Sequence, residues 1–313
     1  MTSLTAWALT TGEAGMRTQA RGLAQAVADV VVEKTISGFA TWPWTPLPLG
    51  RELHAPWPDL VVSCGRRSVS AALAVRKASG GRALAVCIQD PRGRAAEFDL
   101  VIAMGHDRIA ASDSIIKVPT ALHDLTPEAL ARDGAAWARR FARLGHPLTG
   151  VVVGGDLKGR PFTLADGRRL IEGLKHIMAA SGCGLAITPS RRTPAGVRVQ
   201  LSEAFVGNPR VFIWDLTDDN PYRAILALSD RLVVTSDSVS MVSEALSAPH
   251  PVEILDLGFR RHAAFIQGLV DRGLARRFTG DPTPPAAIGL INATELAAQA
   301  VRALLQARTG VSG

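Results

Sequence analysis

Residues 231–245 have the sequence RLVVTSDSVSMVSEA. The apolar run Leu232 to Val234 is typical of a buried strand, and the stretch 239–247 shows the apolar spacing of a helix. A strand that leads through one hydroxyl-rich turn into a helix is the building unit of a parallel α/β sheet. Ligands of such sheets bind beyond the carboxyl ends of the strands, so this turn is a candidate ligand site.

The same alternation of strands and helices extends outward to both ends of the chain. In the first half, strands are predicted at 6–10, 60–64, 83–88, 100–103 and 115–118, and helices at 16–29 and 68–79. In the second half, strands are predicted at 151–153, 185–188, 211–215, 231–235 and 252–256, and helices at 166–181, 222–229 and 239–247. Two similar parallel α/β sheets are therefore expected.

A helical stretch separates the two halves. It begins at Thr126-Pro127-Glu128, an order of cap residue and proline that is typical of a helix start, and it ends at Gly145-His146-Pro147. We therefore predict an N-terminal domain over 1–149 and a C-terminal domain over 150–313. The Ala-rich stretch 294–307 is expected to form a last helix that packs back on the N-terminal domain, and the Trp- and Pro-rich stretch 42–58 a long loop.

The composition limits the class of protein. Hydrophobic residues make up 47% of the 313 residues, which is enough for a core. The longest uncharged apolar runs are far shorter than the ~20 residues of a membrane-spanning helix. The net charge of +7 is spread over both halves and aromatic residues are only 5%, so no nucleic-acid partner is expected. No secretory signal is visible and the three cysteines favour reduced thiols, so we expect a cytoplasmic protein.

Two loops that follow first-half strands offer groups that bind anions. Gly12 and Gly15 lie where a strand turns into a helix, and they let backbone amides approach an anion or a sugar; a simple tight turn is the alternative. The order G-x-x-G lacks the full dinucleotide-binding pattern. Arg66 and Arg67 follow the next predicted strand and suit a phosphate or a carboxylate, with a solvated arginine pair as the alternative.

Two further loops of the first half carry candidate proton acceptors. Gln89 and Asp90 end a buried strand before Pro91, where a carboxylate serves either as a general base or as a cap for backbone groups. His106 stands beside Asp107 after another strand, and a carboxylate next to an imidazole can orient it as a base. Asp90 and His106 are therefore the candidate catalytic residues, and Gln89 belongs to the same predicted cleft.

The turn within 231–245 is the strongest candidate for a ligand site. Its hydroxyl groups and helix-start amides suit a diphosphate, and a glutamate one to two turns inside the helix suits ribose hydroxyls. An over-capped helix with a solvated glutamate is the alternative. The predicted donor-binding residues of this stretch are Asp237, Ser238, Val239, Ser240, Met241 and Glu244.

Two neighbouring loops are expected at the same sheet edge. Gly154 and Gly155 follow one strand and permit a close backbone approach, and Arg191 and Arg192 follow the next and offer two guanidiniums for phosphates. Histidines are never paired at i and i+4, and no D-x-D follows a strand, so no metal is predicted. The arginines and a helix dipole would supply the positive charge instead.

Several of these motifs occur in the same order in a known family. The chain resembles, over most of its length, the plant mitochondrial-fission "elongated mitochondria" proteins and their bacterial relatives. The resemblance rests on Trp7-Ala8-Leu9-Thr10 with Gly12, Gly15-Met16 and Gln19-Ala20, then Ser63-Cys64-Gly65-Arg66-Arg67-Ser68, Gln89-Asp90-Pro91, Ser190-Arg191-Arg192-Thr193-Pro194 and the segment 236–245. The chain departs from the family at Met104-Gly105-His106-Asp107, where members usually have Pro-Glu-His-Asp.

The resemblance implies a GT-B glycosyltransferase fold, with two facing Rossmann-like domains and the nucleotide sugar on the second. The stretch from Asp237 to Glu244 is also similar to the donor-binding helix start of the peptidoglycan N-acetylglucosamine transferase. That similarity implies Glu244 for the ribose, and Ser238, Val239 and Ser240 for the diphosphate.

The implied function is metal-independent transfer of a sugar from a nucleotide diphosphate donor to an envelope polysaccharide or a lipid-linked acceptor. The nucleotide sugar is then a co-substrate, and no further cofactor is expected. A peripheral contact with an anionic membrane at its inner face is compatible with such an acceptor.

Two other functions are weighed against this one. Short-chain epimerases need a Tyr-x-x-x-Lys pair, and the only tyrosine, Tyr222, is followed at the fourth place by Leu226, so that mechanism is excluded. The alternative to a transferase is a non-catalytic adaptor that keeps the fold and recruits a partner to a membrane, as the plant relatives are thought to recruit a dynamin-like GTPase. Nucleotide binding distinguishes the two.

Overall fold

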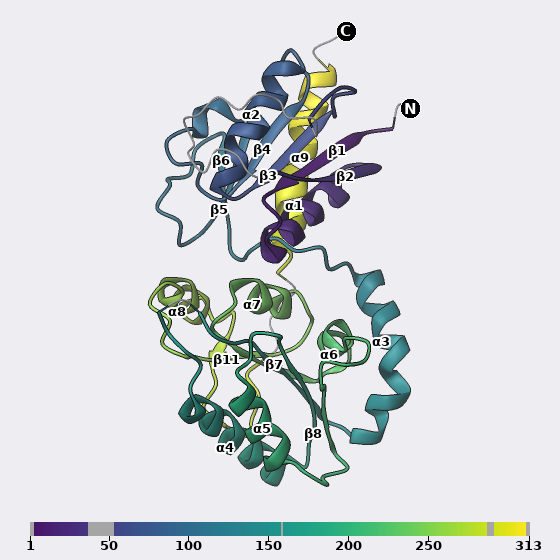
Figure 1. Cartoon of the computed structure of the whole chain (residues 1–313), viewed down its shortest axis with the longest axis vertical. Coiled ribbons are helices and arrows are strands. Elements are labelled where there is room, and N and C mark those ends of the chain that lie inside the picture. The colour runs from purple at the N-terminus through teal and green to yellow at the C-terminus, as the bar shows by residue number, and fades with distance from the viewer. Residues whose placement is uncertain (1–2, 37–52, 158, 287–290, 311–313) are drawn as a thin grey trace. The chain divides into compact units, whose positions relative to one another are not determined.

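The computed structural model describes residues 3–36, 53–157, 159–286 and 291–310 of the chain. It divides into two compact units, the first formed by 1–124 together with 292–313 and the second by 125–291. Within the described residues, each unit contains one six-stranded parallel sheet with helices on both faces (Figure 1). The prediction of two parallel α/β sheets is therefore confirmed.

The sheet of the first unit has the order β2-β1-β3-β4-β5-β6. Its strands are β1 (Thr5–Thr10), β2 (Val30–Thr35), β3 (Leu60–Cys64), β4 (Leu84–Ile88), β5 (Leu100–Met104) and β6 (Ile115–Val118). Its helices are α1 (Ala14–Val27), η1 (Arg66–Ser68), α2 (Val69–Ala78), η2 (Ala95–Glu97) and α9 (Ala293–Gly310).

Alternate residues of these strands pack into separate cores on the two faces of the sheet. Ala6 and Ala8 of β1 pack under α1 and α9, whereas Trp7 and Leu9 pack on the side of α2. Cys64 and Cys87 are buried in these cores, and burial raises the pKa of the Cys87 thiol to about 12. The described cysteines are free thiols, as the sequence predicts.

The sheet of the second unit has the order β12-β11-β10-β7-β8-β9. Its strands are β7 (Leu148–Val153), β8 (Gly184–Pro189), β9 (Val211–Ile213), β10 (Arg231–Thr235), β11 (Val252–Leu255) and β12 (Arg276–Arg277). Its helices are α3 (Pro127–Phe141), η3 (Ala142–Leu144), α4 (Leu164–Ser181), α5 (Ala195–Ala204), α6 (Tyr222–Leu228), α7 (Val239–Leu246) and α8 (Ala263–Asp271).

Two helices of the second unit begin at residues whose side chains cap the helix N-terminus. The Thr126 side chain accepts a hydrogen bond from the Ala129 amide at the start of α3. At the start of α4, Thr163 and Asp166 form a reciprocal capping box. Helices α4 and α5 then cover one face of the sheet, and α3, α6, α7 and α8 cover the other.

The boundary between the units differs from the predicted position at 149/150. The units divide between Asp124 and Leu125, because α3, which was expected within the N-terminal domain 1–149, packs against α6 of the second unit. The last helix, α9, belongs to the first unit and runs alongside α1 (Figure 1).

Two expectations concern parts of the chain outside regular structure. The long loop predicted at 42–58 lies largely outside the described residues, and its described part, 53–58, contains no helix or strand. Among the described helices, none is both long and apolar enough to cross a membrane.

Candidate functional site

The second unit contains a cavity of about 620 Å³ at the carboxyl ends of β7 and β8. Its walls come from the ends of these strands, from the loops that follow β8 and β9, from the start of α6, and from one face of α7. The lining residues are Val152, Val153, Thr188, Pro189, Ser190, Arg191, Arg192, Trp214, Leu216, Thr217, Asp218, Asp219, Asn220, Tyr222, Met241 and Glu244. The cavity lies where ligands bind in parallel sheets.

Two of the predicted donor-binding residues of α7 line this cavity. Glu244 is half-buried, and its Oε2 accepts a hydrogen bond of 2.5 Å from the Tyr222 hydroxyl of α6. Met241 lies one turn earlier on the same helix, in agreement with the i, i+3 spacing of one helix face. Tyr222 was not predicted as a site residue, although as the only tyrosine, at a helix start after a strand and a polar loop, it carries a weak signal.

The two predicted arginines line the cavity but differ in their contacts. Arg192 forms an ion pair of 3.0 Å with Asp237, and its Nη1 donates to the Asp156 carbonyl at 3.2 Å. Arg191 has an exposed side chain in the wall of the cavity. Arg192 thus holds neighbouring loops together, whereas Arg191 is placed to meet a ligand.

Asp237 is a buried connector between loops and does not line the cavity. Its side chain has no exposed surface, and its Oδ2 accepts hydrogen bonds from the Gly155 amide at 2.9 Å and from Arg192 at 3.0 Å. Its Oδ1 accepts a hydrogen bond of 2.6 Å from the Thr235 hydroxyl. The predicted role of Asp237 in donor binding stays a prediction, and the contacts that the structure shows for its carboxylate are with neighbouring loops.

The two predicted glycines, Gly154 and Gly155, lie in tightly packed backbone beside the loops after β8 and β10. The Gly154 amide donates to the Thr235 hydroxyl at 2.8 Å, and the Gly155 amide donates to Asp237. A Cβ on Gly154 would overlap the Asp237 carboxylate, and a Cβ on Gly155 would overlap the Arg192 carbonyl. The expected close backbone approach therefore exists, but it is made to the protein's own loops.

The first turn of α7 lies beside the cavity. Ser238 is the N-cap, since its side chain accepts a hydrogen bond of 3.3 Å from the Met241 amide. Val239 and Ser240 are half-buried and occupy the first two helical positions, where backbone amides have no preceding helical carbonyl. Among the described residues, Ser238, Val239 and Ser240 are not part of the cavity wall.

The predicted loops of the first unit lie at the carboxyl ends of β1 and β3. Gly12 has a φ of +96°, a conformation that favours glycine, and its amide donates to the Thr10 hydroxyl. Gly15 lies in the first turn of α1, where its carbonyl accepts from the Gln19 side chain. Arg66 and Arg67 are exposed in η1, directly after β3.

One of these loops contains a carboxyl group whose pKa lies below its ordinary value. The Thr11 hydroxyl donates a hydrogen bond to Glu13, which is the main cause, and attraction by Arg67 adds to it.

The predicted bases Asp90 and His106 lie after β4 and β5. Asp90 Oδ1 accepts a hydrogen bond of 2.8 Å from the Arg92 amide, so this carboxylate stabilises its own turn. Gln89 precedes it with a positive φ of 79°. Asp107 Oδ2 accepts a hydrogen bond of 2.8 Å from the Met104 amide, which holds this carboxylate in the turn after β5.

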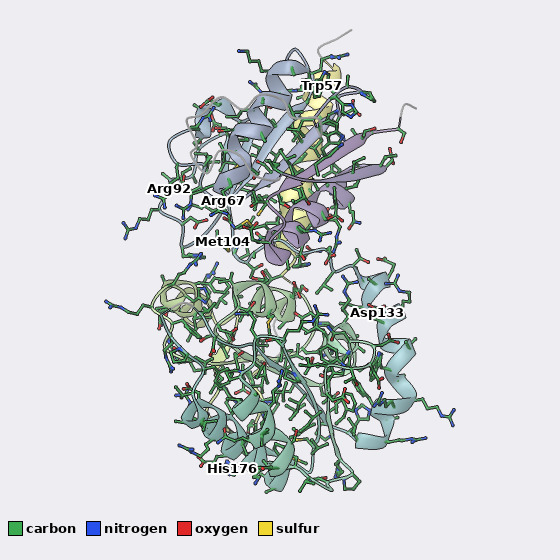
Figure 2. All side chains as sticks on the ribbon, viewed as in Figure 1. Trp57, Arg67, Arg92, Met104, Asp133 and His176 are labelled. Carbon is green, nitrogen blue, oxygen red and sulfur yellow. The ribbon has the colours of Figure 1, made fainter. Side chains whose placement is uncertain are left out.

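The carboxyl edge of the first sheet combines these turns with exposed cations. Figure 2 labels Arg67, Arg92 and Met104, which follow or end the neighbouring strands β3, β4 and β5. The candidate bases thus belong to the first unit, and all residues that line the cavity belong to the second. Within the described residues, no group of three or more histidine, cysteine, aspartate or glutamate side chains is placed to hold a metal ion.

Comparison with known sequences gives a consistent match. A family model described as "Mitochondrial fission ELM1" matches residues 14–305. The "Mitochondrial fission protein ELM1" of Arabidopsis thaliana is 31% identical in an alignment of 277 residues that covers 80% of this chain. The match spans 65% of the length of that relative.

Comparison with solved structures shows the fold. The UDP-GlcNAc 2-epimerase of Methanocaldococcus jannaschii superposes with a TM-score of 0.61 at 10% identity, covering 97% of this chain and 100% of that one. The glycosyltransferase SnogD of Streptomyces nogalater superposes with a TM-score of 0.52 at 12% identity, covering 100% of both chains. The fold is therefore GT-B-like, an architecture that epimerases and glycosyltransferases share.

Proposed function

The chain belongs to the mitochondrial fission ELM1 family, and we propose that it is a glycosyltransferase whose second unit binds a nucleoside diphosphate sugar. The observation that carries this proposal is the cavity of about 620 Å³, because its wall combines Arg191 and Arg192 with Glu244. Its volume lies in the range of ~300–1,000 Å³ that is typical of small-molecule sites.

The lining chemistry fits the parts of such a donor. A guanidinium binds phosphate oxygens through two parallel hydrogen bonds, which suits Arg191 for a diphosphate. A carboxylate accepts hydrogen bonds from hydroxyl groups, which suits Glu244 for a ribose. Trp214 and Tyr222 add aromatic surface to the same wall.

The proposed reaction moves the sugar from the donor to an envelope polysaccharide or a lipid-linked acceptor. The bond between the sugar and the diphosphate breaks, and charge develops on the leaving diphosphate, where Arg191 and the start of α7 would stabilise it without a divalent ion. An acceptor hydroxyl must lose a proton, and we keep Asp90 and His106 of the first unit as the proposed bases. Gly12, Gly15, Arg66, Arg67 and Gln89 are proposed for the acceptor side.

The test is direct titration of uridine and guanosine diphosphates, and of sugars that they carry, by calorimetry. We expect one of these ligands to bind the full chain, and Glu244→Gln to weaken it at least tenfold, or about 1.4 kcal/mol. Glu203→Gln is the matched control, because Glu203 is exposed on α5 and does not line the cavity. If no nucleotide binds, the non-catalytic adaptor is the better account.

A second assay separates a transferase from an epimerase. The exclusion of Tyr-x-x-x-Lys chemistry applies only to short-chain epimerases, and the UDP-GlcNAc 2-epimerases compared above have the GT-B-like fold. Incubation with UDP-GlcNAc alone, followed by NMR of the sugar, would reveal epimerisation. We expect no epimer, and an epimer would replace the transferase proposal. Donor binding that persists in a chelator would support metal independence.

A further inference from the structure

Glu244 is held in place by a side chain from another helix. The Tyr222 hydroxyl of α6 donates to Glu244 Oε2 of α7, and both side chains line the cavity. The two residues are separated by 22 positions in the sequence. This contact therefore exists only because α6 and α7 pack on the same face of the sheet.

Tyr222 is itself fixed at both of its ends. Its amide donates a hydrogen bond of 3.0 Å to the Asn220 side chain, directly at the start of α6. Its ring packs against the apolar core of the second unit, as does Met241 of α7. The phenol therefore presents its hydroxyl from a rigid base, whereas a glutamate side chain by itself has several rotamers.

From this geometry we propose that Tyr222 is a positioning residue, which fixes the Glu244 carboxylate so that the cavity selects ribonucleoside over 2′-deoxyribonucleoside diphosphates. The inference rests on the proposed function, since it assumes that Glu244 meets the ribose. It goes beyond that function by assigning Tyr222 a role and the cavity a sugar specificity.

The physical reason is preorganisation. A carboxylate that is already held in place loses little rotamer freedom when a ligand binds, so more of its hydrogen-bond energy is available for affinity. A ligand that lacks the 2′-hydroxyl makes one hydrogen bond fewer to this carboxylate, and sites built to bind a hydroxyl group discriminate against the analogue that lacks it. Without the phenol, the Glu244 carboxylate loses one of the contacts that orient it toward the ligand, and the penalty for the missing hydroxyl falls.

The experiment compares dissociation constants of uridine diphosphate and 2′-deoxyuridine diphosphate, with the two guanosine analogues in parallel. The proteins are the wild-type chain, Tyr222→Phe, Glu244→Gln and the double variant. Tyr222→Phe keeps the ring in the core and removes only the hydroxyl, so its melting temperature serves as the check on folding.

We expect the wild type to prefer the ribonucleotide at least tenfold. Tyr222→Phe should reduce this preference threefold or more while changing the affinity for the deoxy analogue less than twofold. In the Glu244→Gln background, the Tyr222→Phe change should have no additional effect, because the two residues act as one unit.

Any other result shows whether the proposed function or only the role of Tyr222 is wrong. If the wild type binds neither nucleotide, the proposed function fails and this inference fails with it. If the wild type binds and Glu244→Gln weakens binding, but Tyr222→Phe lowers the affinity for both sugars equally or for neither, then Tyr222 has only a packing role. The inference is then overturned, and the proposed function stands.

Discussion

The carboxyl edges of the two sheets use charged residues in different ways. In the first unit, Asp90 and Asp107 each accept a backbone amide from their own turn. In the second unit, Asp237 connects the ends of three neighbouring strands, because it binds Gly155 after β7, Arg192 after β8 and Thr235 at the end of β10. The same architecture thus builds separate turns at one edge and one connected wall beside a cavity at the other.

This difference indicates at which edge a substitution will destabilise more than its own loop. A carboxylate that satisfies one exposed amide can be replaced by water, whereas a buried carboxylate with partners on several loops cannot. The predictions below test this contrast, from the largest expected effect to the smallest.

Removing the buried connector should have the largest effect. Asp237→Ala leaves the buried Gly155 amide and Thr235 hydroxyl without their acceptor, and each buried donor left unsatisfied costs about 1–3 kcal/mol. Asp90→Ala should lower the free energy of unfolding by about 1 kcal/mol or less, because its turn is partly exposed. Urea unfolding of both variants measures the difference, and equal losses would contradict the contrast.

The second-largest loss of stability is expected when a methyl group is added between the connected loops. In Gly155→Ala the Cβ meets the backbone carbonyl of Arg192, which cannot rotate away, and overpacking of this kind costs about 1–3 kcal/mol. Gly93→Ala is the comparison in the first unit, since a Cβ there meets nothing within 4 Å and only the positive φ of 81° opposes it. Thermal unfolding would show whether Gly155→Ala is the more damaging change.

Substitutions of single arginines should show which side chain contributes to ligand affinity and which also contributes to the stability of the loops. Arg191→Gln is expected to weaken nucleotide binding about tenfold, or about 1.4 kcal/mol, with an unchanged melting temperature. Arg192→Gln should lower both, because the Arg192 side chain also holds Asp237. Arg92→Gln, an exposed arginine at the edge of the first sheet, is the control for a general effect of charge. An Arg191→Gln variant that melts early would assign Arg191 a structural role.

The smallest effect concerns the start of α4. Burial acts to raise the pKa of the Asp166 carboxyl, but hydrogen bonds from Thr163 and the nearby Arg160 outweigh it and hold the pKa below its ordinary value. The group therefore stabilises the fold above the unfolded pKa of about 4, and this stabilisation is lost as the pH falls through the lower folded pKa.

The pH dependence of the free energy of unfolding, compared between Asp166→Asn and the wild type, tests this contribution. Asp166→Asn should cost about 1 kcal/mol at pH 7, a typical value for a helix cap, and the difference from the wild type should shrink below pH 4. Helix α1 of the first unit offers the contrast, since its N-cap residue Glu13 forms no side-chain cap. A pH-independent difference would show that the charge of Asp166 is not involved.

The sequence predicts the central strands well because they are buried on both faces. The runs that form β3 and β4 are mostly apolar, and all their residues are buried. Strand β2 was not predicted, because it is an edge strand that begins three residues after α1 ends, with Val30 and Val32 exposed. Helix α5 was also missed, because only Val197 and Leu201 of its ten residues are buried.

Four residues that were predicted to lie close together do so, because their proximity follows from strand order. Arg191, Arg192, Met241 and Glu244 line the cavity, because loops after neighbouring parallel strands meet at one edge. The contact between Tyr222 and Glu244 depends on how two helices pack, which no local pattern contains. The burial of Asp237 likewise follows from three converging loops, so its sequence context alone suggested a ligand group.

Helix α9 lies at the end of the sequence but packs in the first unit. The first unit therefore cannot finish folding until the whole chain has been synthesised. The apolar residues Ala293, Ala297, Ala298 and Val301 fill the core beside α1, and Thr294 exchanges hydrogen bonds with the His123 backbone, 171 positions earlier. The ribosome makes residues 125–291 before it makes this helix. The second unit can therefore fold while the first still exposes an apolar groove on α1, so the part that is translated first is the last to be finished.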